Sequence, residues 1–186
     1  ETGSGKTTQI AQFLIEEAAA EGRSLRVVCT QPRRISAIGV AERIAAERGE
    51  VVGTGAVGYA VRGEVRQSAS NSLLVCTAGV LLRRLEEDPD LRSFDVVLVD
   101  EVHERSVEHD LLLLALRRIL SQQEQQQRPR TARARRPRRR ATARDRDRAA
   151  PTTTMTATAT ATAPPPPPPP RLRVGLMSAT ADAAVL

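Results

Sequence analysis

Short apolar runs alternate with longer amphipathic stretches along most of the chain. The runs are rich in β-branched residues, and nearly continuous ones such as Val96–Val99 predict strands that are buried on both faces. The longer stretches repeat their apolar residues at helical spacing, as Ile10, Phe13 and Leu14 do in the first of them. This alternation predicts βαβ units around a parallel sheet. We expect strands near residues 25–30, 56–62, 72–77, 95–100 and 172–178, and helices near 6–21, 34–48, 79–87 and 107–120.

The segment 121–170 breaks this pattern. It contains 10 of the 12 prolines, none of the 11 glycines and almost no large apolar side chain. Because it has little to bury, we expect a disordered insert that ends in a polyproline II rod. The segment has 11 arginines and only three acidic residues, so the positive net charge of the chain, +6, comes from this segment. These arginines could add salt-sensitive affinity for RNA or DNA; the alternative is a tolerated low-complexity insertion, or a misread intron.

The length of 186 residues allows one domain and little more. We divide the chain into a structured part, residues 1–120 with 171–186, and the insert 121–170. The chain does not begin with Met and starts inside a motif, so we expect a fragment of a longer protein. No apolar stretch approaches the roughly 18 residues of a membrane span, so we expect no membrane contact.

Two cysteines, Cys29 and Cys76, each lie in an apolar run. This placement favours buried thiols in a reducing compartment over a disulfide or a metal pair. We therefore expect an intracellular protein, and the sequence does not choose between cytoplasm and nucleus.

The first residues carry the strongest local signal for chemistry. In a phosphate loop, glycines let backbone N–H groups turn toward an anion, a lysine reaches the β- and γ-phosphates, and a hydroxyl binds Mg²⁺. Gly3, Gly5, Lys6 and Thr7 supply these parts at the start of an expected helix. Lys6 is the only lysine among 28 basic residues, which suggests that arginine does not replace it there. The loop predicts nucleotide binding; the alternative is a glycine-rich turn without a ligand.

An acidic pair follows the apolar run at 96–99. Asp100 and Glu101 would lie at the carboxyl end of a parallel strand, where α/β proteins bind their ligands. Asp100 can hold Mg²⁺ through its water shell, and Glu101 can position and deprotonate an attacking water. Adjacent buried carboxylates are costly without a cation. Beside a phosphate loop, the pair therefore favours a nucleotide-hydrolysing site over a solvated acidic turn.

Five segments, in the same order and spacing, resemble the motifs of DEAH/RHA-type superfamily 2 RNA helicases, in the variant with Asp-Glu-Val-His. They are Gly3–Gln9 (motif I), Thr30–Ala37 (motif Ia), Cys76–Leu85 (motif Ib), Asp100–Ser106 (motif II) and Ser178–Thr180 (motif III). The resemblance covers everything except the insert. It implies a RecA-like P-loop NTPase lobe, an α/β fold whose parallel sheet is flanked by helices. It also implies ATP and Mg²⁺ as cofactors, single-stranded RNA as substrate, and a second RecA-like lobe that this chain lacks.

The resemblance further implies roles for residues of the nucleotide site. Arg43 would stack on the adenine, and its alternative is an ordinary exposed helix charge. Thr7 and Asp100 would hold the metal. The catalytic residues would be Lys6, Asp100, Glu101 and His103, of which His103 links the nucleotide to the second lobe. The residues that bind ATP would be Thr2, Gly3, Ser4, Gly5, Lys6, Thr7, Thr8 and Arg43.

Other residues would bind RNA or couple hydrolysis to movement. By resemblance, Arg33, Arg34 and Thr77 contact the RNA backbone. For the arginines the alternative is a surface charge pair, but positive charge at a helix start opposes the helix dipole and favours an external anion. Ser178 and Thr180 would couple hydrolysis to movement on the strand. His109 matches no motif, and we expect it at the surface.

Two departures from the family stand out, and two rival functions stay open. The family usually has Pro where Ala11 stands, and it has no insert like 121–170. We expect a fragment of an ATP-dependent RNA helicase with weak or no activity alone. The rivals are an inactive nucleotide-binding module that interacts through its Arg/Pro-rich segment, and a DNA-directed helicase. The presence of Lys6, Asp100 and Glu101 favours the enzyme. The sequence does not indicate which RNA, which pathway or which protein partners are involved.

Overall fold

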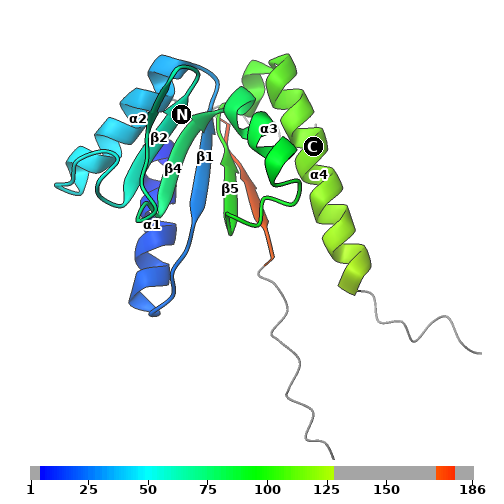
Figure 1. Cartoon of the computed structure of the whole chain (residues 1–186), viewed down its shortest axis with the longest axis horizontal. Helices are drawn as coiled ribbons and strands as arrows, with labels where there is room; N and C mark the ends of the chain where they lie inside the picture. Colours follow the sequence, from blue (N-terminus) through cyan, green and yellow to red (C-terminus); the bar gives the residue numbers. More distant parts are fainter. Residues whose placement is uncertain (1–4, 128–170, 179–186) are drawn as a thin grey trace, which may run out of the picture. The chain divides into compact units, whose positions relative to one another are not determined.

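A six-stranded sheet organises the computed structural model, which describes residues 5–127 and 171–178 (Figure 1). The strand order is β3-β2-β4-β1-β5-β6, and every neighbouring pair is parallel except β2 and β3. The strands are β1 (Val27–Gln31), β2 (Val57–Val61), β3 (Glu64–Arg66), β4 (Leu73–Thr77), β5 (Val96–Val99) and β6 (Arg173–Leu176). The helices are α1 (Lys6–Ala20), α2 (Arg34–Glu47), α3 (Ala78–Glu87), the short η1 (Val102–Glu104) and α4 (Val107–Gln127).

Helices cover both faces of the sheet, which explains why its central strands are mostly apolar. Successive side chains of a strand point to opposite faces. On β1, Val27 and Cys29 pack in the core with α1 and α2, whereas Val28 packs in the core with α3 and α4. All five residues of β1 are buried. A strand that is buried on both faces therefore needs an apolar residue at nearly every position.

The predicted parallel sheet and its four long helices are confirmed, with ends that differ by one or two residues in most elements. The exception is β3, which the sequence did not reveal. It pairs with β2 in antiparallel fashion through a two-residue turn whose Gly63 has a φ of 84°. Glycine adopts this conformation without strain. Because β3 has three largely exposed residues, it lacks the apolar run by which strands are found.

Helix α4 ends at Gln127 rather than at residue 120. Glutamine is a good helix former, so the first residues of the segment 121–170 extend the helix. The rest of that segment lies outside the described residues.

The apolar face predicted for α1, Ile10, Phe13, Leu14 and Ala18, packs against the core except at Phe13. Ala11, Ile15 and Ala18 are buried, and their spacing of four and three residues follows one helix face. Phe13 lies about 200° around the helix from Ala11 and is 61% exposed, so its assignment to the core was wrong. Ile10 packs against the same core and is partly buried.

His109 is buried, not at the surface as expected. Its exposed fraction is 1%, and its Nδ1 lies 2.7 Å from the hydroxyl of Ser106. The same hydroxyl accepts the backbone N–H of His109 at 3.2 Å, which is the geometry of a helix N-cap. The ring therefore completes the start of α4, although its Nε2 has no hydrogen-bond partner within the described residues.

A matched pair of leucines on α4 tests how this helix is packed. Leu116 is fully buried in the core, whereas Leu114 is 62% exposed. We expect Leu116→Ala to lower the free energy of unfolding by about 2–5 kcal/mol, because it leaves a cavity. The same change at Leu114 should cost less than about 0.5 kcal/mol. Urea unfolding of both variants checks this, and equal losses would contradict the packing of α4.

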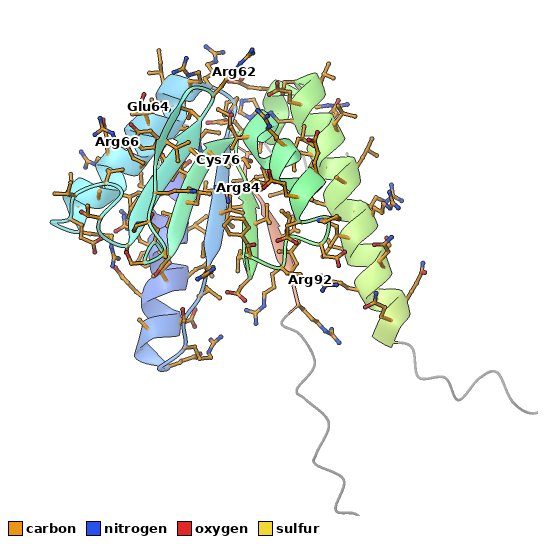
Figure 2. All side chains as sticks on the ribbon, viewed as in Figure 1. Arg62, Glu64, Arg66, Cys76, Arg84 and Arg92 are labelled. Carbon is orange, nitrogen blue, oxygen red and sulfur yellow. The ribbon has the colours of Figure 1, made fainter. Side chains whose placement is uncertain are left out.

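The two thiols are buried and free, as expected, and Cys76 lies on β4 within the sheet (Figure 2). Burial raises the pKa of both Cys29 and Cys76, that of Cys76 to about 12. The unfolded chain loses these protons near the ordinary value of 9.0, while the folded chain keeps them. The free energy of unfolding should therefore be unaffected below pH 9 and fall above it, by about 1.4 kcal/mol per pH unit for each thiol.

Comparison with Cys76→Ala isolates this effect from other groups that titrate at high pH. The urea midpoint of the unsubstituted chain should fall more steeply between pH 9 and pH 11 than that of Cys76→Ala. Identical slopes would show that the Cys76 thiol ionises equally well in the folded chain.

Candidate active site

The carboxyl ends of the parallel strands meet at one edge of the sheet, which we call the carboxyl edge. Gln31 of β1 is paired with Thr77 of β4, and Asp100 follows β5 directly. The backbone N–H of Asp100 donates to the carbonyl of Thr30 at 3.2 Å, so Asp100 continues beside β1. The predicted acidic pair thus occupies the edge where α/β folds bind ligands.

Asp100 is the centre of this edge, with an exposed fraction of 5%. Its Oδ2 accepts hydrogen bonds from the Thr7 hydroxyl and, at 2.7 Å, from Nε2 of Gln31. Its Oδ1 accepts the backbone N–H of Glu101 at 2.9 Å. The carboxylate therefore joins the start of α1 to β1 and β5. The structure brings together Thr7 and Asp100, the two residues predicted to hold the metal.

Neutral donors surround Asp100, and this arrangement fits a divalent cation. Asp100 makes no ion pair within the described residues, and a buried carboxylate is costly unless a positive charge answers it. Hydroxyl and carboxylate oxygens are hard ligands of the kind that Mg²⁺ prefers. Over residues 5–127 and 171–178, no group of three or more His, Cys, Asp or Glu side chains could hold a metal. Mg²⁺ takes few protein ligands and completes its shell with phosphate oxygens and water.

Gly5 is the described residue directly before α1, and its conformation suits the predicted phosphate loop. Gly5 precedes the helix with a φ of 73°, a left-handed conformation that glycine adopts without strain. Its carbonyl accepts hydrogen bonds from the Gln9 backbone and the Thr8 hydroxyl, at 2.8 and 3.1 Å. The positive end of α1 therefore points to the region beside Asp100. Lys6 begins the helix, but its side chain lies outside the described part of the structure, as do Thr2, Gly3 and Ser4.

Glu101 and His103 lie on the turn that follows β5. Glu101 adopts the left-handed region, with a φ of 52° and a ψ of 41°, which costs a residue other than glycine about 1–2 kcal/mol. Such strain persists where the surrounding structure holds it, and here Val102 N–H donates to the Met177 carbonyl at 3.2 Å. Oε2 of Glu101 lies 3.2 Å from Nδ1 of His103. The turn thus holds the Glu101 carboxylate against His103, while the Glu101 backbone N–H contacts Asp100.

The same histidine connects motif II with motif III. Nδ1 of His103 lies 3.3 Å from the hydroxyl of Ser178, which follows β6. The segment before it is held by the Met177 N–H, which donates to the Val99 carbonyl at 2.8 Å. Thr180 lies outside the described residues. The structure therefore joins Glu101, His103 and Ser178 in one chain of polar contacts.

The residues predicted to bind RNA lie at the same edge. Arg33 precedes α2, its side chain is 75% exposed, and it makes a long ion pair of 3.6 Å with Glu104. Arg34 begins α2 and is exposed. Thr77 precedes α3 and is partly exposed. An exposed pair this weakly held is worth little, so the arginines are available to a ligand.

Arg43 belongs to a polar cluster that the sequence did not reveal. Glu47 accepts hydrogen bonds from Arg43 Nε at 2.6 Å, Gln12 Nε2 at 2.8 Å and Gln9 Nε2 at 3.2 Å. The hydrogen bond from Arg43, followed by that from Gln12, lowers the pKa of the Glu47 carboxyl. The cluster links Arg43, which lies on α2, to α1, the helix that follows the predicted phosphate loop.

Gln31 and Glu47 are two residues of the candidate site that sequence reasoning missed. Gln31 is buried, and its amide orients the Asp100 carboxylate. A signal was present, because Gln31 lies within the segment that resembles motif Ia, at the end of a strand that begins with the apolar run Val27–Cys29. Glu47 had no comparable signal, since an acidic residue on an exposed helix face is ordinary.

Comparison with known proteins supports these assignments at the level of the family. Residues 1–185 match the DEAD/DEAH box helicase family. The chain is 54% identical over 125 residues to the DExH-box ATP-dependent RNA helicase DExH1 of Arabidopsis thaliana. The aligned residues make up 66% of this chain and 12% of that protein. The chain is 53% identical over 124 residues to the human putative ATP-dependent RNA helicase DHX57, with coverages of 66% and 9%.

A third relative, the bovine ATP-dependent DNA/RNA helicase DHX36, is 46% identical over 125 residues, or 65% of this chain and 12% of that protein. The chain thus spans about a tenth of the length of these curated relatives. The resemblance seen in the sequence is confirmed, and the mostly parallel sheet flanked by helices agrees with a RecA-like lobe. Because the match extends over residues 1–185, the chain belongs to the DEAD/DEAH box helicase family.

Proposed function

We propose that this chain is the ATP-binding lobe of an ATP-dependent RNA helicase, in which hydrolysis of Mg²⁺-ATP drives movement on single-stranded RNA. The contact between Thr7 and Asp100 carries the proposal, because it joins a phosphate-loop helix to a buried carboxylate at the carboxyl edge. The relatives named above as RNA helicases support the choice of substrate.

Each residue of the edge then has a defined task. Thr7 and Asp100 hold the Mg²⁺, and Lys6 binds the β- and γ-phosphates. The metal, when bound, neutralises charge that develops on the phosphate oxygens. Glu101 orients a water in line with the γ-phosphate and takes its proton as the new oxygen–phosphorus bond forms, while the bond from the γ-phosphorus to the bridging oxygen breaks and ADP leaves. Gln31 keeps the Asp100 carboxylate in position.

The chain of contacts from Glu101 to Ser178 supports a role in coupling. His103 contacts both residues through Nδ1, so a change at the carboxylate alters the polar partners of the segment that follows β6. We propose that Ser178 and Thr180 transmit this change to a second RecA-like lobe of the complete helicase, which we call the full-length parent protein.

We further propose that RNA crosses the carboxyl edge over Arg33, Arg34 and Thr77. Guanidinium and hydroxyl groups bind phosphate oxygens without reading the sequence of bases. Residues 1–120 with 171–186 form the lobe, residues 121–127 extend its helix α4, and the rest of 121–170 is an insert. Two alternatives stay open: a DNA-directed helicase, since the bovine relative is a DNA/RNA helicase, and an inactive nucleotide-binding module.

The decisive experiment measures ATP hydrolysis by the full-length parent protein alone, with single-stranded RNA, and with single-stranded DNA. Stimulation by RNA supports the proposal, and stronger stimulation by DNA favours the DNA-directed helicase. Nucleotide binding without turnover under all three conditions would leave only the binding module.

Replacing Arg34 by Ala tests the proposed RNA surface. We expect the affinity for single-stranded RNA to fall to a similar extent for all sequences, and the dependence of log K on log[salt] to become shallower by about one unit. Arg92→Ala is the matched control, since Arg92 is an exposed arginine at the opposite end of the sheet (Figure 2). Equal losses in the two variants, measured by fluorescence anisotropy over a salt series, would count against this surface.

A further inference from the structure

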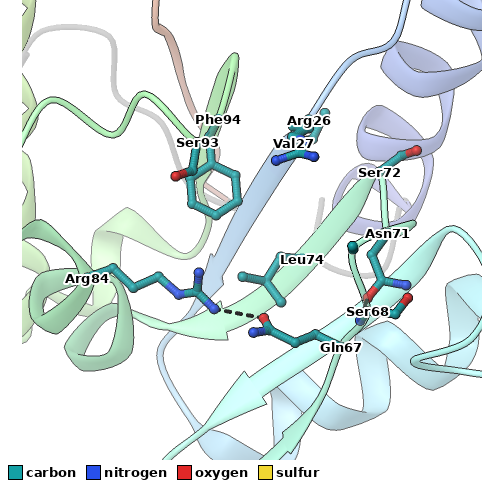
Figure 3. A pocket seen from close by; sticks show the side chains of 11 residues that line it. Arg26, Val27, Gln67, Ser68, Asn71, Ser72, Leu74, Arg84, Ser93 and Phe94 are labelled. Atoms are coloured by element: carbon teal, nitrogen blue, oxygen red, sulfur yellow. Dashed lines mark hydrogen bonds between the residues drawn. The ribbon is translucent and has the colours of Figure 1, made fainter. Parts of the chain in front are cut away.

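A cavity of about 350 Å³ lies at the amino edge of the sheet, away from the proposed nucleotide site (Figure 3). Val27 at the start of β1 lines it, whereas Gln31 at the other end of that strand contacts Asp100. At about 3.3 Å per residue, the strand separates the two places by roughly 13 Å. The cavity is thus a different feature from the carboxyl edge, and its volume falls within the range of small-molecule sites.

Two arginines from separate segments face this cavity, Arg26 before β1 and Arg84 near the end of α3. Among the described residues that line it, none is acidic. Arg84 donates to the neutral Oε1 of Gln67 at 2.7 Å, and its guanidinium lies 5.9 Å from the centre of the Phe94 ring. The Arg26 side chain makes no ion pair in the described part of the chain. Neither positive charge is therefore matched by a carboxylate, which favours an anionic ligand.

Two carboxylates on segments that line the cavity accept hydrogen bonds from the backbone. Asp95 Oδ2 accepts the N–H of Arg26 at 2.8 Å, and Asp88 Oδ2 accepts the N–H of Ser93 at 3.0 Å. Both carboxylates hold the walls of the cavity in place and do not line it. Among the described residues, neither carboxylate forms an ion pair with Arg26 or Arg84.

The remaining lining defines the rest of the ligand. Figure 3 shows Leu74 in the middle of the cavity, with Arg84 and Gln67 on one side and Arg26 and Phe94 on the other. Val27, Leu74 and the Phe94 ring give an apolar floor, which suits a flat body attached to the anion. Guanidinium forks match the oxygens of a phosphate better than any other side chain.

We propose that this cavity binds a small phosphomonoester with a flat body, of the nucleoside monophosphate class, through Arg26 and Arg84. The phosphate accepts hydrogen bonds from both guanidinium groups, and the flat body lies over Leu74 and Phe94. This site is independent of the proposed function at the carboxyl edge.

Calorimetric titration with AMP tests the proposal, using the full chain with Lys6→Ala to suppress binding at the phosphate loop. We expect one AMP per chain, and at least tenfold weaker binding in Arg26→Gln, because one charge-assisted pair is lost. Arg84→Gln should weaken AMP to a similar extent. Arg92→Gln, which changes an exposed arginine outside the cavity, should leave the affinity unchanged.

Further arms separate the phosphate from the flat body. Adenosine and inorganic phosphate should each bind at least tenfold more weakly than AMP. Arg84→Gln also removes contacts with Gln67 and Phe94, so its thermal unfolding is measured alongside. If Arg84→Gln unfolds, the Arg26→Gln variant alone provides the test. Unchanged AMP affinity in Arg26→Gln, equal affinity for adenosine, equal affinity for phosphate alone, or no saturable binding would each overturn the proposal.

Discussion

Replacing Glu101 by Gln is expected to lower the rate of ATP hydrolysis by the parent protein about 100- to 10,000-fold, with ATP binding nearly unchanged. Glutamine has the shape of glutamate but does not take a proton from water. It can still accept a hydrogen bond from His103, whose Nδ1 lies 3.2 Å from the carboxylate. The turn after β5 should therefore keep its conformation, and the loss should fall on the chemical step.

The measurements are steady-state hydrolysis with saturating RNA and equilibrium binding of a fluorescent ATP analogue. Glu108→Gln provides the control, because Glu108 is an exposed glutamate in the first turn of α4. That variant should hydrolyse ATP within about twofold of the parent. Turnover by Glu101→Gln within tenfold of the parent would show that another group accepts the proton.

Replacing Asp100 by Asn should weaken the binding of Mg²⁺ rather than the transfer of a proton from the attacking water. We expect Mg²⁺-dependent nucleotide affinity and turnover each to fall about 10- to 100-fold, the usual effect of removing a group that holds a metal through its water shell. The structure adds a second reason. Oδ2 accepts hydrogen bonds from Thr7 and Gln31, so an amide NH₂ in that position would face the Nε2 donor of Gln31. An unsatisfied buried donor costs about 1–3 kcal/mol.

A titration of nucleotide affinity against Mg²⁺ separates the two acidic residues. The stimulation of binding by Mg²⁺ should be lost in Asp100→Asn and retained in Glu101→Gln. Asp90→Asn is the control, since Asp90 is exposed and pairs with Arg92 at the amino edge. If Mg²⁺ strengthens nucleotide binding equally in Asp100→Asn and the parent, Asp100 does not hold the metal.

Local patterns determined most of the fold, for a physical reason. The strands at the centre of the sheet are buried on both faces, so their apolar runs are visible without any tertiary information. The long helices carry their apolar residues at a period that differs from that of strands. β3 escaped because a short, exposed edge strand has no core face to mark it. Phe13 was misassigned because helical spacing alone did not show that it lies outside the face that α1 buries.

The sequence by itself also determined the family and the acidic pair, because short motifs carry their chemistry in residue type and spacing. Only the tertiary structure decided which distant side chains meet. Thr7 and Asp100 are 93 positions apart, and Glu47 lies 38 positions from Gln9, so no local pattern could pair them. Burial of His109 and the charged cavity between Arg26 and Arg84 likewise depend on the packing of separate segments. Periodicity reveals that a residue is buried on its own element, whereas contacts between elements depend on strand order and register, which the chain adopts only on folding.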